Sequence, residues 1–266
     1  MKKLLFLTIL FSVFLFVGQA DAAIAFNSSS TGGTGSGTQV TVASGDVSGS
    51  DRAVIIAITI GGGDNLNGLS YDGENIFGKM VAKTQYGDYA NRCYMFLHSN
   101  PPTGVKNVSA TVSAANNIYV NIISYTGVLQ SDTVNASATK KQSSGTSISQ
   151  NVTTTADNAW LVSSICTVGT SVTAGANTVK RAVDPGPHSY AGDSNTDQTP
   201  VGSYSQAYSW TGSDNNAIIV AALAPAELVS AEPNRSVIII ISMLNSLYNS
   251  LIALFSFGVA YAKNIL

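Results

Sequence analysis

The sequence predicts an all-β fold: an antiparallel two-layer β-sandwich of jelly-roll type, with an N-terminal signal helix and a C-terminal hydrophobic helix. Three observations predict it. Between residues 24 and 225, short apolar runs alternate with turns rich in Gly, Asn, Asp and Ser, which is the pattern of strands and turns. No segment in this range keeps the period of an amphipathic helix. Both ends of the chain, in contrast, carry long apolar runs.

The composition excludes several classes of protein. Of the 266 residues, 45% are hydrophobic and only 11% are charged, and the net charge is −2 at pH 7. This balance leaves no basic field that would attract nucleic acid, and the chain is too apolar to be intrinsically disordered. With two His and two Cys, it is neither a Cys-rich zinc scaffold nor a disulfide-dense miniprotein. We therefore expect no nucleic-acid partner.

Residues 1–22 have the organisation of a secretory signal peptide. Lys2 and Lys3 form its positive start, Leu4–Val17 its apolar run, and an Ala-x-Ala cleavage site ends at Ala22. The alternative is an uncleaved anchor, but the run is shorter than the ~20 residues that span a bilayer. We therefore expect export to the extracellular side or the cell surface.

Residues 236–262 contain no charged side chain, and a run of this length suffices for one transmembrane helix. We expect this helix to anchor the protein in a membrane, and we interpret residues 226–235 as a linker. A polar stripe along the helix leaves an alternative open, in which the helix lies in the interface or packs on the domain. The stripe consists of Ser242, Asn245, Ser246, Asn249 and Ser250.

The even spacing of strand signals between the two ends is typical of a sandwich or jelly roll. A glycine-rich stretch before the first of them, Gly32–Gly37, is interpreted as a flexible lead-in. The clearest predicted strands are Thr38–Ala43, Arg52–Ile60, Lys79–Tyr86, Asn91–His98, Asn107–Ser113, Ile118–Tyr125, Ala159–Val168, Asn177–Val183, Ser203–Thr211 and Ala217–Ala224. Weaker ones are Asn67–Tyr71, Val134–Thr139 and Ser147–Thr154.

In four of these strands, a polar turn is followed directly by an almost uninterrupted aliphatic run. Strands that are apolar on both faces are covered on both sides in a folded sheet. Because the four fall into two similarly spaced pairs, we interpret residues 23–225 as two similar halves of one two-layer sandwich domain. The alternative is two stacked sandwich domains with a boundary near residues 131–145. The four aliphatic runs begin at Arg52, Ile118, Ala159 and Ala217.

The segment from Asn91 to Val112 reads NRCYMFLHSNPPTGVKNVSATV. It resembles the strand–Asn-Pro-Pro-x-Gly–strand hairpin of a group of secreted bacterial and phage-associated β-sandwich surface proteins. Thr154–Trp160 and the closing strand Ala217–Pro225 are also similar to that group. The resemblance covers roughly residues 40–225 and implies a jelly-roll-like sandwich on an exposed structure. It implies no site residues.

Cys93 and Cys166 both lie in predicted strands. An exported protein reaches a compartment in which disulfides persist, so the two thiols could form an inter-strand bond. The alternative is two buried free thiols, which are common core residues. The sequence leaves both open, because pairing requires Cα atoms within about 7 Å of each other.

Asp193, Asn195 and Asp197 alternate along the chain as the oxygen ligands of a Ca²⁺ loop do. The EF-hand pattern then fails, because Gln198 stands where Gly is required and Tyr204 where Glu is required. A structural calcium ion at this loop is a hypothesis, and we expect no other cofactor. The alternative is ordinary turn chemistry, since Asp and Asn hydrogen-bond their own backbone in turns.

Three tyrosines in predicted loops are the candidates for binding a ligand such as a sugar: Tyr86, Tyr89 and Tyr190. His98 and His188 each have a Ser neighbour, but adjacency in sequence is not the geometry of a triad. The sparse carboxylates show no spacing that selects the facing pair of a glycosidase. We therefore assign no catalytic residue and expect no enzyme.

Low charge, many small polar residues and the apolar C-terminal run favour one function. We expect a non-enzymatic, extracellular cell-surface protein whose sandwich has a structural or adhesive role. Its partners would be surface proteins or glycans, and the C-terminal helix would attach it to a membrane. The first alternative is a carbohydrate-binding module, supported by calcium. The second is a glycoside or ester hydrolase on a sandwich scaffold, and fold alone does not decide among the three.

Overall fold

The computed structural model describes residues 23–226, except 64, 87–90, 132, 184–187 and 214, and also Ser246 and Ser250. Residues 23–226 belong to one compact unit. The predicted signal peptide, nearly all of the predicted linker at 226–235, and the predicted helix at 236–262 except two serines lie outside the described residues. Within the part that is described, no helix is both long and apolar enough to cross a membrane.

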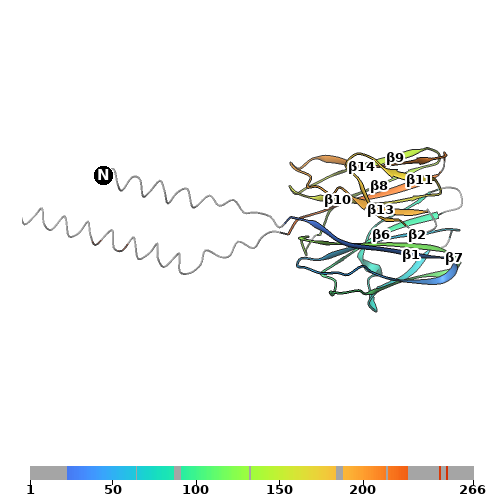
Figure 1. Ribbon diagram of the computed structural model, residues 1–266, viewed down its shortest axis with the longest axis horizontal. Coiled ribbons are helices and arrows are strands. Elements are labelled where there is room, and N and C mark those ends of the chain that lie inside the picture. The colour runs from blue at the N-terminus through green and yellow to red at the C-terminus, as the bar shows by residue number, and fades with distance from the viewer. Residues whose placement is uncertain are drawn as a thin grey trace, which may run out of the picture. The chain divides into compact units, whose positions relative to one another are not determined.

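The described part of the domain is all-β, as predicted, and its strands pair antiparallel in three sheets. The first sheet folds over on itself, so the sheets form four stacked layers (Figure 1). Layer 1 holds β3 (Leu66–Tyr71), β4 (Glu74–Asn75), the end of β1 (Ala25–Ala43) and the start of β7 (Asn107–Thr126). Layer 2 holds the other halves of β1 and β7 with β2 (Ala53–Ile60), β5 (Met80–Tyr86) and β6 (Asn91–Ser99); the short 3₁₀ helix η1 (Phe77–Lys79) precedes β5. Layer 3 is the sheet of β12 (Val179–Val183), β13 (Ser189–Asp193), β10 (Trp160–Thr167), β15 (Asn216–Leu223) and β8 (Val134–Gln142). Layer 4 holds β11 (Thr170–Ala174), β14 (Ser203–Thr211) and β9 (Ser147–Thr153).

Three apolar cores separate the four layers. Along β2, Ile56 belongs to the core between layers 1 and 2, while Ile55 belongs to the core between layers 2 and 3. Along β10, Val162 belongs to that same central core, while Leu161 belongs to the core between layers 3 and 4. Every residue of β2, β10 and β15 is buried. These strands are therefore covered on both faces, as their aliphatic runs predict.

The prediction of two layers is wrong. A two-layer sandwich has one core, and each of its strands turns one face to solvent. Strands that are apolar on both faces need a core on each side, and the fold provides this by stacking two sandwiches back to back. The boundary between the halves lies between β7 and β8, at residues 127–133, which overlaps the start of the predicted stretch at 131–145.

The first sheet curls because β1 and β7 bend together in the middle. Their pairing shifts register between Thr34 and Gln39, and the two halves of β1 then face each other. A Cβ atom at Gly32 would lie 2.8 Å from Cγ2 of Val42, so the close approach requires a glycine at this position. The stretch Gly32–Gly37 is therefore part of a paired strand, and its interpretation as a flexible lead-in is wrong.

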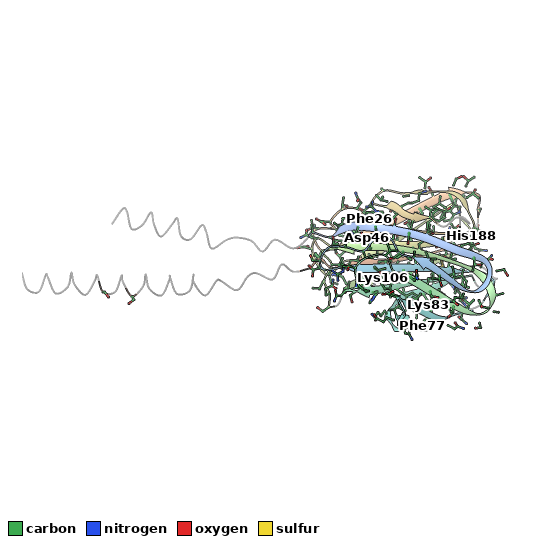
Figure 2. The ribbon with its side chains drawn as sticks, turned by 60° about the horizontal axis from the view of Figure 1, so that its bottom comes forward. Phe26, Asp46, Phe77, Lys83, Lys106 and His188 are labelled. Atoms are coloured by element: carbon green, nitrogen blue, oxygen red, sulfur yellow. A yellow bond between two sulfur atoms is a disulfide. The ribbon has the colours of Figure 1, made fainter. Side chains whose placement is uncertain are left out.

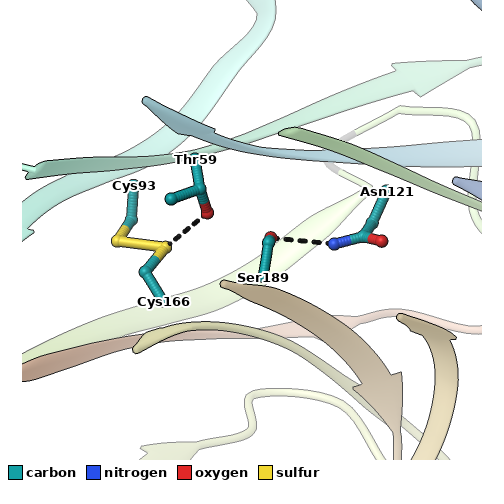
Figure 3. Close-up of a disulfide and its surroundings, with 5 residues drawn as sticks. All are labelled: Thr59, Cys93, Asn121, Cys166 and Ser189. Atoms are coloured by element: carbon teal, nitrogen blue, oxygen red, sulfur yellow. Dashed lines mark hydrogen bonds between the residues drawn. A yellow bond between two sulfur atoms is a disulfide. The ribbon is translucent and has the colours of Figure 1, made fainter. Parts of the chain in front are cut away.

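A disulfide joins Cys93 of β6 to Cys166 of β10, with 6.2 Å between the Cα atoms (Figure 3). It crosses the central core, so it links the inner sheets of the two halves. Thr59 Oγ1 lies 2.9 Å from Cys166 Sγ. Asn121 donates a 2.8 Å hydrogen bond to Ser189, again from layer 2 to layer 3. The halves are thus connected by covalent and polar contacts as well as by apolar packing.

Most predicted strands are present, and the misses have a common cause. The strand β13 falls in a stretch that the sequence analysis read as loop, because its residues Ser-Tyr-Ala-Gly-Asp lack β-branched side chains. All five of its residues are buried nevertheless. The strand β11 and the first half of β1 are also too polar to give a strand signal. Tertiary pairing overrides the weak local preference in each case.

Candidate functional site

A groove runs along β5, an edge strand of its sheet, where the two halves of the domain meet. Its volume is about 570 Å³, within the range of roughly 300–1,000 Å³ typical of ligand sites. The lining comes from both halves, namely β5 and β6 of the first half and β8 of the second. The polar lining residues include Lys83, Thr84, Gln85, Arg92, Thr139 and Lys141.

The strand registers determine which face each of these side chains occupies, because directly opposed residues in an antiparallel pair share a face. Thr84 is paired with Cys93, a residue of the central core, so it faces the second half. Lys141 is paired with Ala217, also a residue of the central core, so it faces the first half. Thr84 and Lys141 therefore line the same side of β5.

The other side of β5 carries the remaining charges. Lys83 is paired with Tyr94, which belongs to the core between layers 1 and 2, and Gln85 is paired with Arg92. These side chains therefore share the face turned towards layer 1. The groove passes around the exposed edge of β5, with cationic residues on both sides of that edge. Figure 2 shows Lys83 at the periphery of the domain.

The named lining of the groove contains three cations and no carboxylate. Lys83, Arg92 and Lys141 make no ion pair with any described residue. Arg92 is half-buried, and its Nη1 atom is buried without a hydrogen-bond partner. A buried donor on a charged group that lacks an acceptor carries a desolvation cost. An anionic ligand with acceptor oxygens would remove that cost.

Two neighbouring lysines of β8 show that this arrangement is specific. Lysines on edge strands often serve to prevent pairing with another chain. Lys140 is paired with Ile218, which belongs to the core between layers 3 and 4, and its Nζ donates a 3.2 Å hydrogen bond to the Ser149 carbonyl. Lys141 points to the opposite face and lines the groove. Only the second lysine is available to a ligand there.

A second groove, of about 320 Å³, lies on layer 1. Its lining has no charged side chain and combines amides, hydroxyls and one aromatic ring. Gln39 donates a 2.6 Å hydrogen bond to Ser109, and Thr111 donates one of 2.8 Å to Asn67. Phe77, which is labelled in Figure 2, contributes its ring. This chemistry suits a neutral sugar, whose hydroxyls and apolar face need such partners.

The three tyrosines predicted to bind a ligand lie in different environments. Tyr190 lies in β13 and is 3% exposed, with its ring in the core between layers 3 and 4. The prediction that Tyr190 lies in an exposed loop is wrong, because Tyr190 belongs to a strand that is buried on both faces. Tyr86 ends β5, one residue after Gln85 of the groove lining. Tyr89 lies outside the described residues.

The predicted calcium ligands are engaged by protein groups. The fully buried Asp193 accepts hydrogen bonds from Arg181 Nε, at 2.8 Å, and from the Tyr125 hydroxyl, at 3.0 Å. Asn195 Oδ1 accepts a hydrogen bond from the same guanidinium. Asp197 accepts one of 2.8 Å from Trp160 Nε1. The positive charge facing this loop is therefore that of Arg181.

The ion pair also acts on Tyr125. Burial, reinforced by the Asp193 carboxylate, raises the pKa of the Tyr125 hydroxyl well above its ordinary value. The hydroxyl therefore stays protonated and acts as a donor to Asp193. In the part of the chain that is described, no group of three or more His, Cys, Asp and Glu side chains could hold a metal ion.

His98 is part of a polar cluster at the end of β6. Lys79 Nζ lies 2.9 Å from Nδ1 of His98, and Glu74 Oε2 lies 3.6 Å from Nε2. Because an ammonium group only donates, the neutral imidazole carries its proton on Nε2. The ring contacts Tyr71 edge-on, at 5.1 Å between centroids. Burial, followed by the Lys79 charge, lowers the pKa of His98, and Glu74 opposes the shift.

No sequence motif marks Lys83, Arg92 and Lys141 as site residues. Lys83 and Arg92 lie on two predicted strands that follow each other in the chain, Lys79–Tyr86 and Asn91–His98. Pairing these strands as a hairpin would have predicted that the two side chains lie close together. Lys141 lies in the second half, and no local pattern connects it to the other two. No protein-family model matches the chain, and no curated protein matches it either.

Proposed function

We propose that this chain is a non-enzymatic, extracellular cell-surface protein whose double sandwich has a structural or adhesive role. Residues 236–262 would hold it at a membrane. The observation that carries the proposal is the Cys93–Cys166 disulfide, because such bonds persist outside the reducing cytosol. The bond joins the two halves across the central core, which suits a domain that must resist separation by external force.

The outer sheets support an adhesive role as well. On the outer face of layer 4, Ser205 is paired with Asn151 and Ala207 with Ser149. Small polar side chains of this kind give a broad, low-charge surface that can contact a protein or a glycan. The resemblance at Asn91–Val112 implies a jelly-roll-like topology, which is part of this proposal. The hairpin itself is wrong, because β2 lies between β6 and β7 and pairs with both of them.

Surface location can be tested with the full chain in a bacterial expression host. Intact cells are treated with a membrane-impermeant amine-reactive biotin reagent, and the labelled protein is recovered after lysis. We expect labelling of intact cells, and we expect deletion of residues 236–262 to release the protein into the medium. Protein that becomes labelled only after lysis, or that carries two free thiols, would overturn the proposal.

A carbohydrate-binding module is the second candidate, and the two polar grooves favour it. The full chain, applied to a glycan array with and without calcium, tests this candidate directly. Tyr86→Ala and Tyr89→Ala test the two tyrosines at and after the end of β5. Reproducible binding to one glycan class supports the candidate, whereas a blank array in both conditions rejects it for the glycans present.

A further inference from the structure

We propose that the groove around β5 binds an acidic polysaccharide, whose carboxylate or sulfate groups are held by Lys83, Arg92 and Lys141. This inference rests on the proposed extracellular location, where such polymers occur, and names the ligand class of the candidate site. The groove combines three cations from both halves of the domain with neutral hydrogen-bonding groups along a continuous surface.

The three cations of the groove favour an anionic ligand. None of the three cations has an ion-pair partner among the described residues, although the net charge of the whole chain is −2. The carboxylates nearest to these cations along the chain, Asp88 and Asp132, lie outside the described residues. The buried Nη1 of Arg92 still lacks an acceptor, and a guanidinium binds a carboxylate or sulfate through parallel hydrogen bonds.

The neutral groups point to a sugar polymer instead of a lone anion. Thr84, Gln85 and Thr139 add hydroxyl and amide groups to the lining, and these suit the hydroxyls of a sugar. Arg92 and Lys141 lie on opposite sides of the β5 edge. A small anion would reach one side only, whereas an extended chain that crosses the edge contacts both.

A local cationic groove on an acidic chain is not the surface that nucleic acid needs. Nucleic-acid binding proteins present a broad basic face that contacts many phosphates. Here the positive charge is confined to a groove of about 570 Å³, in a chain with 13 Lys and Arg against 15 Asp and Glu. An oligonucleotide is therefore a competitor in the test and not the proposed ligand.

The test measures binding of the full chain, purified in mild detergent, to immobilised polysaccharides at several salt concentrations. The probes are polygalacturonate for carboxylates, dextran sulfate for sulfates, and neutral dextran. We expect binding to one or both acidic polymers that weakens as salt rises, and no binding to dextran. The two acidic probes distinguish the two kinds of anionic group.

Single substitutions then locate the site. Arg92→Gln should weaken binding about tenfold or more, and Lys141→Gln about fivefold, in line with the loss of a charge-assisted hydrogen bond. Lys140→Gln is the matched control, because its side chain points to the other face of the same strand; its affinity should stay within about twofold. Melting temperatures measured in parallel show whether Arg92→Gln still folds, and Arg92→Lys retains the charge without the planar fork.

Three results would overturn the inference. The first is equal affinity for dextran and polygalacturonate. The second is unchanged affinity in Lys141→Gln and in a correctly folded Arg92→Gln. The third is tighter binding of a single-stranded oligonucleotide than of either acidic polysaccharide, with the same sensitivity to the variants. Surface labelling reports independently on location, so a labelled protein that binds no polyanion refutes only this inference.

Discussion

Lys141 and Cys166 lie in one cross-strand row of layer 3, with Ala217 between them. The partner of Cys166, Cys93, is paired with Thr84 of β5 and follows Arg92 in β6. The disulfide therefore connects the two strand rows that carry the opposite walls of the groove. The packing of layer 2 on layer 3 therefore both brings the two sulfur atoms together and sets the distance between the groove walls.

Removal of the disulfide should destabilise the domain and loosen the groove. Cys93→Ala with Cys166→Ala should lower the free energy of unfolding by about 2–4 kcal/mol, as expected for closure of a long loop. Affinity for an acidic polymer should fall by less than in Arg92→Gln, since no direct contact is lost. Denaturant titration and the binding measurement check both effects. A thiol titration of the denatured, unreduced protein should find no free thiol, and two free thiols would contradict the pairing.

Asp193→Asn should be among the most destabilising single substitutions. It leaves the Arg181 guanidinium, whose side chain is 16% exposed, without its carboxylate partner, at a cost of about 3 kcal/mol. Asp197→Asn is the control, because the asparagine retains an acceptor oxygen for Trp160 Nε1; its effect should stay within about 0.5 kcal/mol. Urea titrations measure both, and equal losses would refute a special role for the buried pair.

The melting temperature should be the same in calcium and in EDTA. Arg181 already supplies the positive charge that faces Asp193 and Asn195, and a calcium ion would have to displace it. Differential scanning calorimetry at constant ionic strength measures this. A rise of the melting temperature with calcium that Asp193→Asn abolishes would support the calcium hypothesis.

Stability should decrease as the pH falls below about 6.5, the ordinary pKa of histidine. The pKa of His98 is lowered in the folded state, so the unfolded chain binds a proton first and acid favours unfolding. The stability that neutral His98 contributes is complete above the pKa of the unfolded state. It is lost as the pH falls towards the lower pKa of the folded state. His98→Gln should flatten the slope between pH 5 and 7 in denaturant titrations. An unchanged slope in this variant would exclude His98 as the titrating group.

Gly192→Ala should destabilise the domain by about 3 kcal/mol, as overpacking in a core does. The added Cβ would lie 2.3 Å from the Val179 backbone oxygen and 2.7 Å from the Tyr208 hydroxyl. A paired backbone carbonyl cannot move as a side-chain end can. Gly78→Ala is the control, since nothing lies within 4 Å of its added Cβ. Similar midpoints of denaturation for the two variants would contradict this packing.

Local pattern sufficed where burial is visible in the sequence itself. The runs at Arg52–Ile60 and Ala217–Ala224 are apolar on both faces, and the strands there are buried on both faces. It failed at Ser189–Asp193, because a short strand of small and polar residues has no local signature. The strand is buried because it lies between β12 and β10, and its Asp193 is satisfied by Arg181 of the adjacent strand and by the distant Tyr125.

The candidate site shows the same limit. Lys83 and Arg92 lie on the same face of a predictable hairpin, in neighbouring cross-strand pairs, but Lys141 reaches them only when the two halves stack. Tyr190 illustrates the converse error, since its neighbours His188 and Ser189 look like loop residues in sequence while its ring lies in a core. Side-chain direction follows from register, and register follows from pairing with distant strands.

The sequence by itself determined that the chain from residue 24 to 225 is all-β and that the strands with continuous aliphatic runs lie inside. This is possible because alternation and apolar runs record the number of buried faces of each strand. Only the tertiary structure decided that there are four layers, that Cys93 meets Cys166, and that Lys83, Arg92 and Lys141 share one groove. These outcomes depend on contacts between segments far apart in the chain, and such contacts leave no local pattern.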